Sequence, residues 1–236
     1  LWSIGTHTIS IKAICLENRL RRPQLCGAYR PANLKDTPVM MVLVVGLILF
    51  LGVHLVPTSP ELRDGLKERI GEMPYKAIFS LLSLVGLVVI VLGYHKLQLH
   101  PGKNPILWDP PTWTRHIAVA LMLPAMILLV ASVIPSRIRT AVRHPMLIAI
   151  KTWAFAHLIA NGDLGALLLF GSFLAFAVYD RISVKKRGAQ GPLGNATPSS
   201  AINDVIVVVV GVALYAALLY GGHQWLIGVA PIPALG

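Results

Sequence analysis

Apolar residues gather in six blocks along the chain, and short polar segments separate them. The blocks cover residues 40–56, 74–95, 115–134, 145–160, 164–179 and 201–229. A helix needs about 20 mainly apolar residues to cross the roughly 30 Å hydrocarbon core of a bilayer. The pattern therefore predicts an all-α protein, a polytopic transmembrane helix bundle of about six spans.

The composition agrees with a protein whose surroundings are the lipid bilayer. Hydrophobic residues make up 55% of the chain and charged residues only 13%, against about 25% charged residues in soluble domains. The formal net charge is +11, which in a soluble chain would suggest nucleic acid. Here the charges lie in the loops between the apolar blocks, so they indicate membrane orientation and no nucleic-acid partner.

The loop cations predict how the bundle lies in the membrane. The loops after spans 2 and 4 and the C-terminal tail hold only Lys96, Lys103 and Arg115. The loops after spans 1, 3 and 5 hold ten cations: Arg63, Lys67, Arg69, Arg137, Arg139, Arg143, Arg181, Lys185, Lys186 and Arg187. Since cytoplasmic loops carry the excess of Lys and Arg, we expect the loops after spans 1, 3 and 5 to be cytoplasmic.

Residues 1–39 differ from the rest of the chain. They are basic, show no sustained periodicity, and lack the basic-then-apolar order of a signal peptide. Met40 and Met41 stand directly before the first apolar block. We interpret residues 1–39 as a non-native leader upstream of a translation start at Met40 or Met41; the alternative is a disordered basic tail.

Residues 143–163 combine an apolar span with polar side chains. Ionisable residues inside a span are costly, so they are functional candidates. Trp153, His157 and Asn161 follow one another at intervals of four and should share one helical face. Arg143, His144 and Lys151 precede them as weaker supporting candidates. Lys151 could instead extend its charged end to the membrane surface.

His54 and His157 are the two histidines that apolar sequence surrounds. Imidazole nitrogen suits haem iron, so two such histidines on different helices predict the axial ligands of a haem b. The alternative is that each only hydrogen-bonds to a neighbouring helix. The depths differ, because His157 lies about nine residues, or about 13 Å, deeper than His54 at about 1.5 Å per residue. His144 is the depth-matched alternative partner for His54.

Other chemistries have no motif support. The chain has two cysteines, Cys15 and Cys26, and neither belongs to a CxxC or CxxCH motif. Patterns of the GxSxG, P-loop, GxGxxG and HExxH types do not occur in the sequence. Hydrolase, nucleotide-binding and zinc-protease interpretations therefore lack a motif.

Three segments resemble the NnrU family: Gly52-Val53-His54, residues 69–80 (RIGEMPYKAIFS), and residues 143–157 from Arg-His-Pro to Trp-Ala-Phe-Ala-His. The resemblance extends over residues 40–229. The family includes bacterial proteins associated with denitrification and nitric-oxide metabolism, and the plant and cyanobacterial 15-cis-ζ-carotene isomerases. It implies haem b held by His54 and His157, a bacterial inner membrane, and support of nitric-oxide or nitrite reduction beside denitrification reductase components.

The resemblance leaves the activity open, including whether the chain is an enzyme. The isomerases carry a cysteine three residues before the second histidine, where this chain has Ala154. The chain therefore resembles the bacterial branch more closely. Two alternatives remain, namely a haem-dependent cis–trans isomerase of a polyene and a cofactor-free membrane assembly or transport factor.

Overall fold

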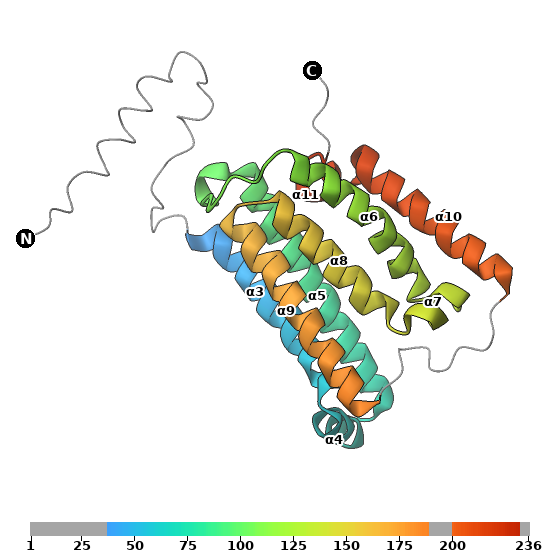
Figure 1. Ribbon diagram of the computed structural model, residues 1–236. Coiled ribbons are helices and arrows are strands. Elements are labelled where there is room, and N and C mark those ends of the chain that lie inside the picture. The colour runs from blue at the N-terminus through green and yellow to red at the C-terminus, as the bar shows by residue number, and fades with distance from the viewer. Residues whose placement is uncertain (1–36, 189–199, 232–236) are drawn as a thin grey trace, which may run out of the picture.

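The computed structural model describes residues 37–188 and 200–231, and it confirms the all-α prediction (Figure 1). In the described residues there is no strand, only an isolated bridge between Ile106 and Asp163. The predicted leader lies outside the described residues, except that positions 37–39 form the start of the first described helix. The helices are α3 (Thr37–Leu55), α4 (Pro60–Ile70), α5 (Glu72–Leu99), α6 (Trp113–Ala131), α7 (Arg137–Val142), α8 (Pro145–Ala160), α9 (Leu164–Arg187), α10 (Ala201–Ala217) and α11 (His223–Ile227), with short turns η2 (Val56–Thr58), η3 (Pro101–Lys103) and η4 (Leu218–Gly222).

Among the described residues, five helical segments are long and apolar enough to cross a membrane: 39–58, 72–99, 113–131, 164–187 and 201–227. Helix α8 has 16 residues, a length of about 24 Å at about 1.5 Å per residue. It is therefore shorter than the other five, although its bounds coincide with the predicted fourth span. It lies between α6 and α9 and packs against both.

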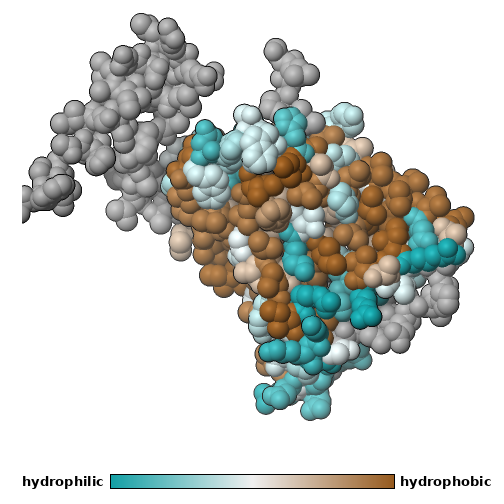
Figure 2. Space-filling model, viewed as in Figure 1, coloured by the Kyte–Doolittle hydropathy of each residue, from teal (hydrophilic) through white to brown (hydrophobic). Residues whose placement is uncertain are grey.

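The helices form a bundle in which α3 packs against α5 and α9, and α6 packs against α8 and α10. Figure 1 shows α4, α7 and the C-terminal end of α9 at one end of the bundle. The opposite end holds η3, α11 and the turn between α8 and α9. Figure 2 shows hydrophobic residues over much of the visible face and hydrophilic residues gathered over the α4 end. This distribution is typical of a multi-pass membrane protein.

Glycines bring α3 and α5 into close contact. A Cβ added at Gly46 would lie 2.7 Å from the backbone nitrogen of Ile90, and one at Gly93 would lie 2.7 Å from that of Leu43. At Gly86 an added Cβ would lie 2.9 Å from the nitrogen of Phe50. Small residues let membrane helices approach backbone to backbone.

The loop between α5 and α6 clasps the turn between α8 and α9. The N–H of Leu107 donates to the carbonyl of Gly162 at 2.7 Å, and the N–H of Leu164 donates to that of Pro105 at 2.9 Å. Gly162 has to be glycine here, because a Cβ would collide with the carbonyl oxygen of Trp108. Asp163 caps α9 by accepting the N–H of Ala166 at 2.7 Å. The clasp fixes the C-terminal end of α8.

Candidate functional site

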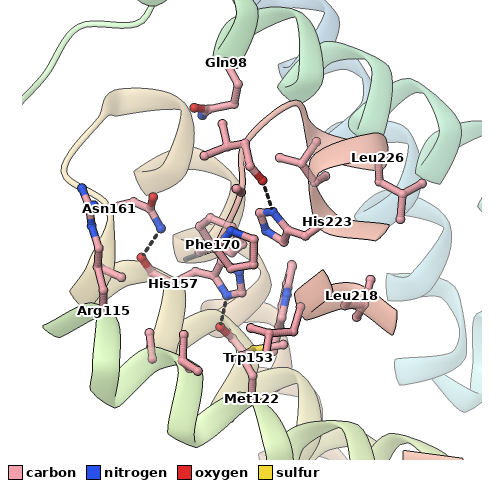
Figure 3. A pocket seen from close by; sticks show the side chains of 18 of the residues that line it. Gln98, Arg115, Met122, Trp153, His157, Asn161, Phe170, Leu218, His223 and Leu226 are labelled. Atoms are coloured by element: carbon pink, nitrogen blue, oxygen red, sulfur yellow. Dashed lines mark hydrogen bonds between the residues drawn. The ribbon is translucent and has the colours of Figure 1, made fainter. Parts of the chain in front are cut away.

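A cavity of about 550 Å³ lies at the α11 end of the bundle. Its walls come from α5, α6, α8, α9 and the segment from α10 to α11. Cofactor and ligand sites in proteins usually measure about 300–1,000 Å³. Most of the wall is apolar, and a few polar side chains reach it (Figure 3).

Trp153, His157 and Asn161 all line this cavity. Trp153 and His157 lie on one face of α8, as their spacing predicts, whereas Asn161 follows the last residue of the helix. The Nδ1 of His157 lies 2.8 Å from the carbonyl oxygen of Trp153. Because a carbonyl only accepts, Nδ1 carries the hydrogen, and the neutral ring keeps its lone pair on Nε2. The ring of Phe170 stacks on that of His157, with centroids 4.4 Å apart. His157 is therefore oriented with a nitrogen lone pair free.

The cavity also has polar groups suited to an anion. Arg115, at the start of α6, lines the cavity and is exposed. The Nε2 of Gln98 is buried in the cavity wall, beside the hydroxyl of Tyr94. Asn161 donates from Nδ2 to the carbonyl of His157 at 2.8 Å. The side chains of Arg115, Gln98 and Asn161 therefore bring N–H donors to the cavity wall.

His223 lies in the same cavity, facing the ring of His157. The ring centroids are 6.3 Å apart, and the ring planes differ by 14°. The histidines that the sequence singles out, His54, His157 and His144, do not include His223. The signal that could have identified it is Gly221-Gly222 directly before it, because two glycines interrupt an otherwise apolar block.

His54 lies outside the cavity, near the α4 end of the bundle. Its Nδ1 donates to the carbonyl of Phe50 at 2.7 Å. Its ring packs against those of Phe50, Phe79 and Phe176 at centroid distances of 4.1, 5.2 and 6.2 Å. Aromatic side chains of α3, α5 and α9 thus surround this histidine.

The structure does not bring His54 and His157 together. The ring of Phe50 beside His54 lies 5.4 Å from that of Phe173, and Phe173 lies 5.4 Å from Trp153 on the His157 side. Three aromatic rings therefore separate the two histidines, in line with their unequal depths. A haem iron shared by His54 and His157 stays a prediction that this arrangement does not favour.

The remaining candidates from the sequence also lie away from the cavity. Arg143 is exposed and has a φ of 63° at the C-terminal end of α7. His144 precedes Pro145 and is half-buried, and burial together with the charge of Arg181 lowers its pKa. Lys151 is half-buried on α8. Arg143, His144 and Lys151 thus have no contact with the site around His157.

The described residues contain no group of three or more His, Cys, Asp or Glu side chains arranged to hold a metal ion. The nitrogen donors that face each other in the cavity are a pair, His157 and His223. Zinc sites take three or four protein ligands, whereas haem iron, already held by four porphyrin nitrogens, takes one or two. The donor set fits haem better than a bare metal ion.

The family model described as NnrU protein matches residues 42–231 of the chain. Neither the curated proteins nor the solved structures gave a match.

Proposed function

This chain belongs to the NnrU family, and we propose that it binds haem b in the cavity at the α11 end, with His157 as an axial ligand. We further propose that the haem protein supports nitric-oxide or nitrite reduction in denitrification. The observation that carries the proposal is the His157 ring, which is fixed by its bond to Trp153 and offers Nε2 to an apolar cavity.

The residues around the cavity fit a haem. Apolar and aromatic walls such as Phe170 suit the porphyrin face, and they exclude water from the iron. The propionate carboxylates need donors, which Arg115, Asn161 and Gln98 supply.

Neighbouring groups of the chain set the tautomer and orientation of the His157 ring. The N–H···O=C bond from His157 to Trp153 fixes the tautomer and raises the basicity of Nε2. Phe170, stacked on the same ring, holds its orientation. When bound, haem supplies an iron centre for one-electron transfer or for coordination of nitric oxide.

The test is an absorption spectrum of the full chain, purified in detergent after expression with ample haem. We expect a Soret band with reduced α and β bands, and we expect loss of haem in His157→Ala. The matched control is His116→Ala, an exposed histidine on α6 that does not line the cavity. Absence of a Soret band in the wild type would overturn haem binding and favour the cofactor-free assembly or transport role.

The role in denitrification needs a test in cells. A bacterial strain that lacks this protein should reduce nitrite or nitric oxide more slowly, and the wild-type gene should restore the rate while His157→Ala should not. Normal reduction in the deletion strain would contradict this role. It would also contradict the proposal that denitrification reductases are partners of this protein.

An apolar cavity with aromatic walls also favours a second candidate, cis–trans isomerisation of a polyene. Ala154, at the position where the isomerases have cysteine, is fully buried in the core. Position 154 therefore offers no thiolate as a ligand for haem iron in this second candidate function. Incubation of the haem-loaded protein with a cis-polyene under reducing conditions separates the two, because only the isomerase changes the isomer composition.

We propose a bacterial inner membrane with the α4 end in the cytoplasm and the cavity toward the outer side. The ten loop cations belong to α4, to the segment from α7 to His144, and to the C-terminal end of α9, which share one end of the bundle. A chain with Cys15 and Cys26 replaced by Ser can carry Lys186→Cys or Gln224→Cys. An impermeant maleimide should label Gln224→Cys from the periplasm and Lys186→Cys only after lysis. The reverse pattern would overturn the orientation.

A further inference from the structure

We infer that His223 is the second axial ligand of the site, opposite His157, so that the chain itself fills both axial positions of the iron. This inference rests on the proposed haem binding and assigns its ligand pair. It replaces His54 by a histidine that lies in the same cavity as His157.

The distance between the two rings fits one metal ion. Two imidazoles that bind one metal ion from opposite sides, each through a bond of about 2 Å, have ring centres about 6.4 Å apart. The centroids of His157 and His223 are 6.3 Å apart. Rings stacked face to face in van der Waals contact are closer, as Phe170 and His157 are at 4.4 Å.

Both rings keep the same nitrogen free. The Nδ1 of His223 donates to the carbonyl of Val229 at 2.6 Å, as that of His157 donates to Trp153 at 2.8 Å. Each neutral ring therefore has its lone pair on Nε2. Histidines that bind metals usually donate their other ring N–H in this way, which fixes the tautomer and the ring orientation.

The backbone around His223 is built to hold this ring. Gly228 has a φ of 86°, in the left-handed region that favours glycine, and it closes α11 so that the Val229 carbonyl turns back to the His223 ring. Helix α11 is also tied to α5, because His95 Nδ1 donates to the carbonyl of Leu226 at 2.9 Å. His223 is thus positioned by a second helix and does not belong to a free tail.

Two protein ligands define the class of chemistry. With His157 and His223 both bound to it, a haem iron would have no open position for a substrate, and its ordinary role would be electron transfer. Carbon monoxide or nitric oxide can bind only after one histidine leaves. His223 is the one to leave, because it stands on the five-residue helix α11, whereas His157 stands within α8 between α6 and α9.

The test compares full-length wild type with His223→Ala, His54→Ala and the control His116→Ala, all purified with haem. The wild type should be six-coordinate and low-spin, and its ferrous form should bind carbon monoxide slowly. His223→Ala should become five-coordinate and bind carbon monoxide at once, whereas His54→Ala and His116→Ala should match the wild type. Because the ring planes differ by 14°, the ferric wild type should give the rhombic low-spin EPR spectrum of near-parallel imidazoles.

The possible outcomes are distinct. A wild type without haem overturns the proposed function itself. A wild type with haem that is five-coordinate, or a His223→Ala spectrum equal to that of the wild type, overturns only the His223 assignment, as does a His54→Ala variant that becomes five-coordinate. A poorly folded His223→Ala is replaced by His223→Gly with added imidazole, which should restore the low-spin spectrum.

Discussion

The side chain of Asn104 joins the loop after α5 to the start of α9 by two hydrogen bonds. Its Nδ2 donates to the carboxylate of Asp163 at 2.7 Å, and its Oδ1 accepts the N–H of Gly165 at 2.9 Å. Asn104 is 6% exposed, so a residue that cannot make these bonds leaves buried polar groups unpaired. These two hydrogen bonds hold together the end of the bundle that contains the cavity.

Replacement of Asn104 should therefore destabilise the protein. We expect Asn104→Ala to lower the free energy of unfolding by about 1–3 kcal/mol. Asn104→Asp should cost more, because it loses the donor and places a second carboxylate beside Asp163. Thermal unfolding in detergent measures both, with the exposed Gln224→Ala as control. An Asn104→Ala melting temperature equal to that of the control would show that the clasp adds no stability.

The glycines of α3 provide a matched pair of variants. Gly46 touches the backbone of α5, whereas an added Cβ at Gly52, six residues further along α3, would meet nothing within 4 Å. Gly46→Ala should push α3 from α5 at a cost of about 1–3 kcal/mol. Gly52→Ala should be neutral or stabilise the helix by up to about 1 kcal/mol. Equal effects of the two substitutions on thermal unfolding would contradict the close packing of α3 on α5.

The positions of the long apolar helices could be predicted from hydropathy, but their ends less well. Helix α8 covers residues 145–160 as expected, because Pro145 starts it and Asn161 leaves the helical backbone at φ −127° and ψ 133°. Helix α9 continues to Arg187, beyond the predicted end at residue 179. Hydropathy marks only the apolar part of a helix, and basic residues can extend it into the headgroup region.

The site was predicted in part, because its residues come from different ranges of the sequence. The shared face of Trp153 and His157 follows from their spacing within one helix, and Asn161 lies directly after that helix ends. The partner across the cavity does not, because it depends on how α11 folds back onto α5 through His95 and Leu226. Local sequence shows two glycines before His223, but no periodicity places its ring opposite His157.

Acidification should destabilise the protein through the partly buried His144. Burial, with the charges of Arg181 and Arg143, holds its pKa below the ordinary value, and Asp180 offsets this in part. As the pH falls through about 6.5, histidine in the unfolded chain binds a proton before the native ring does. The unfolded state then binds more protons, so stability falls with falling pH. Well above pH 6.5, His144 is neutral in both the folded and the unfolded chain, so it should not make the stability depend on pH there.

The measurement is the difference in melting temperature between pH 7.5 and pH 5.5. We expect a smaller difference in His144→Gln than in the wild type, because the glutamine cannot take up a proton in either state. His116→Gln, an exposed histidine on α6, serves as the control. A difference in His144→Gln as large as in the wild type would mean that other groups cause the acid sensitivity.

Arg115 should contribute to haem affinity through charge and not through the iron. It lines the cavity at an exposed position, where water screens an ion pair and leaves about 0.2–1 kcal/mol. Arg115→Gln should therefore raise the haem dissociation constant by at most about five-fold and leave the low-spin spectrum intact. Lys96→Gln removes the same charge from α5 without touching the cavity, so it should leave the affinity unchanged.

Haem transfer to an excess of apomyoglobin at low and high salt measures the haem affinity of both variants, because a propionate contact with Arg115 weakens as salt rises. Equal losses in the two variants would assign the effect to the net charge of this end of the bundle, and a changed spin state in Arg115→Gln would place Arg115 closer to the iron than the cavity geometry does.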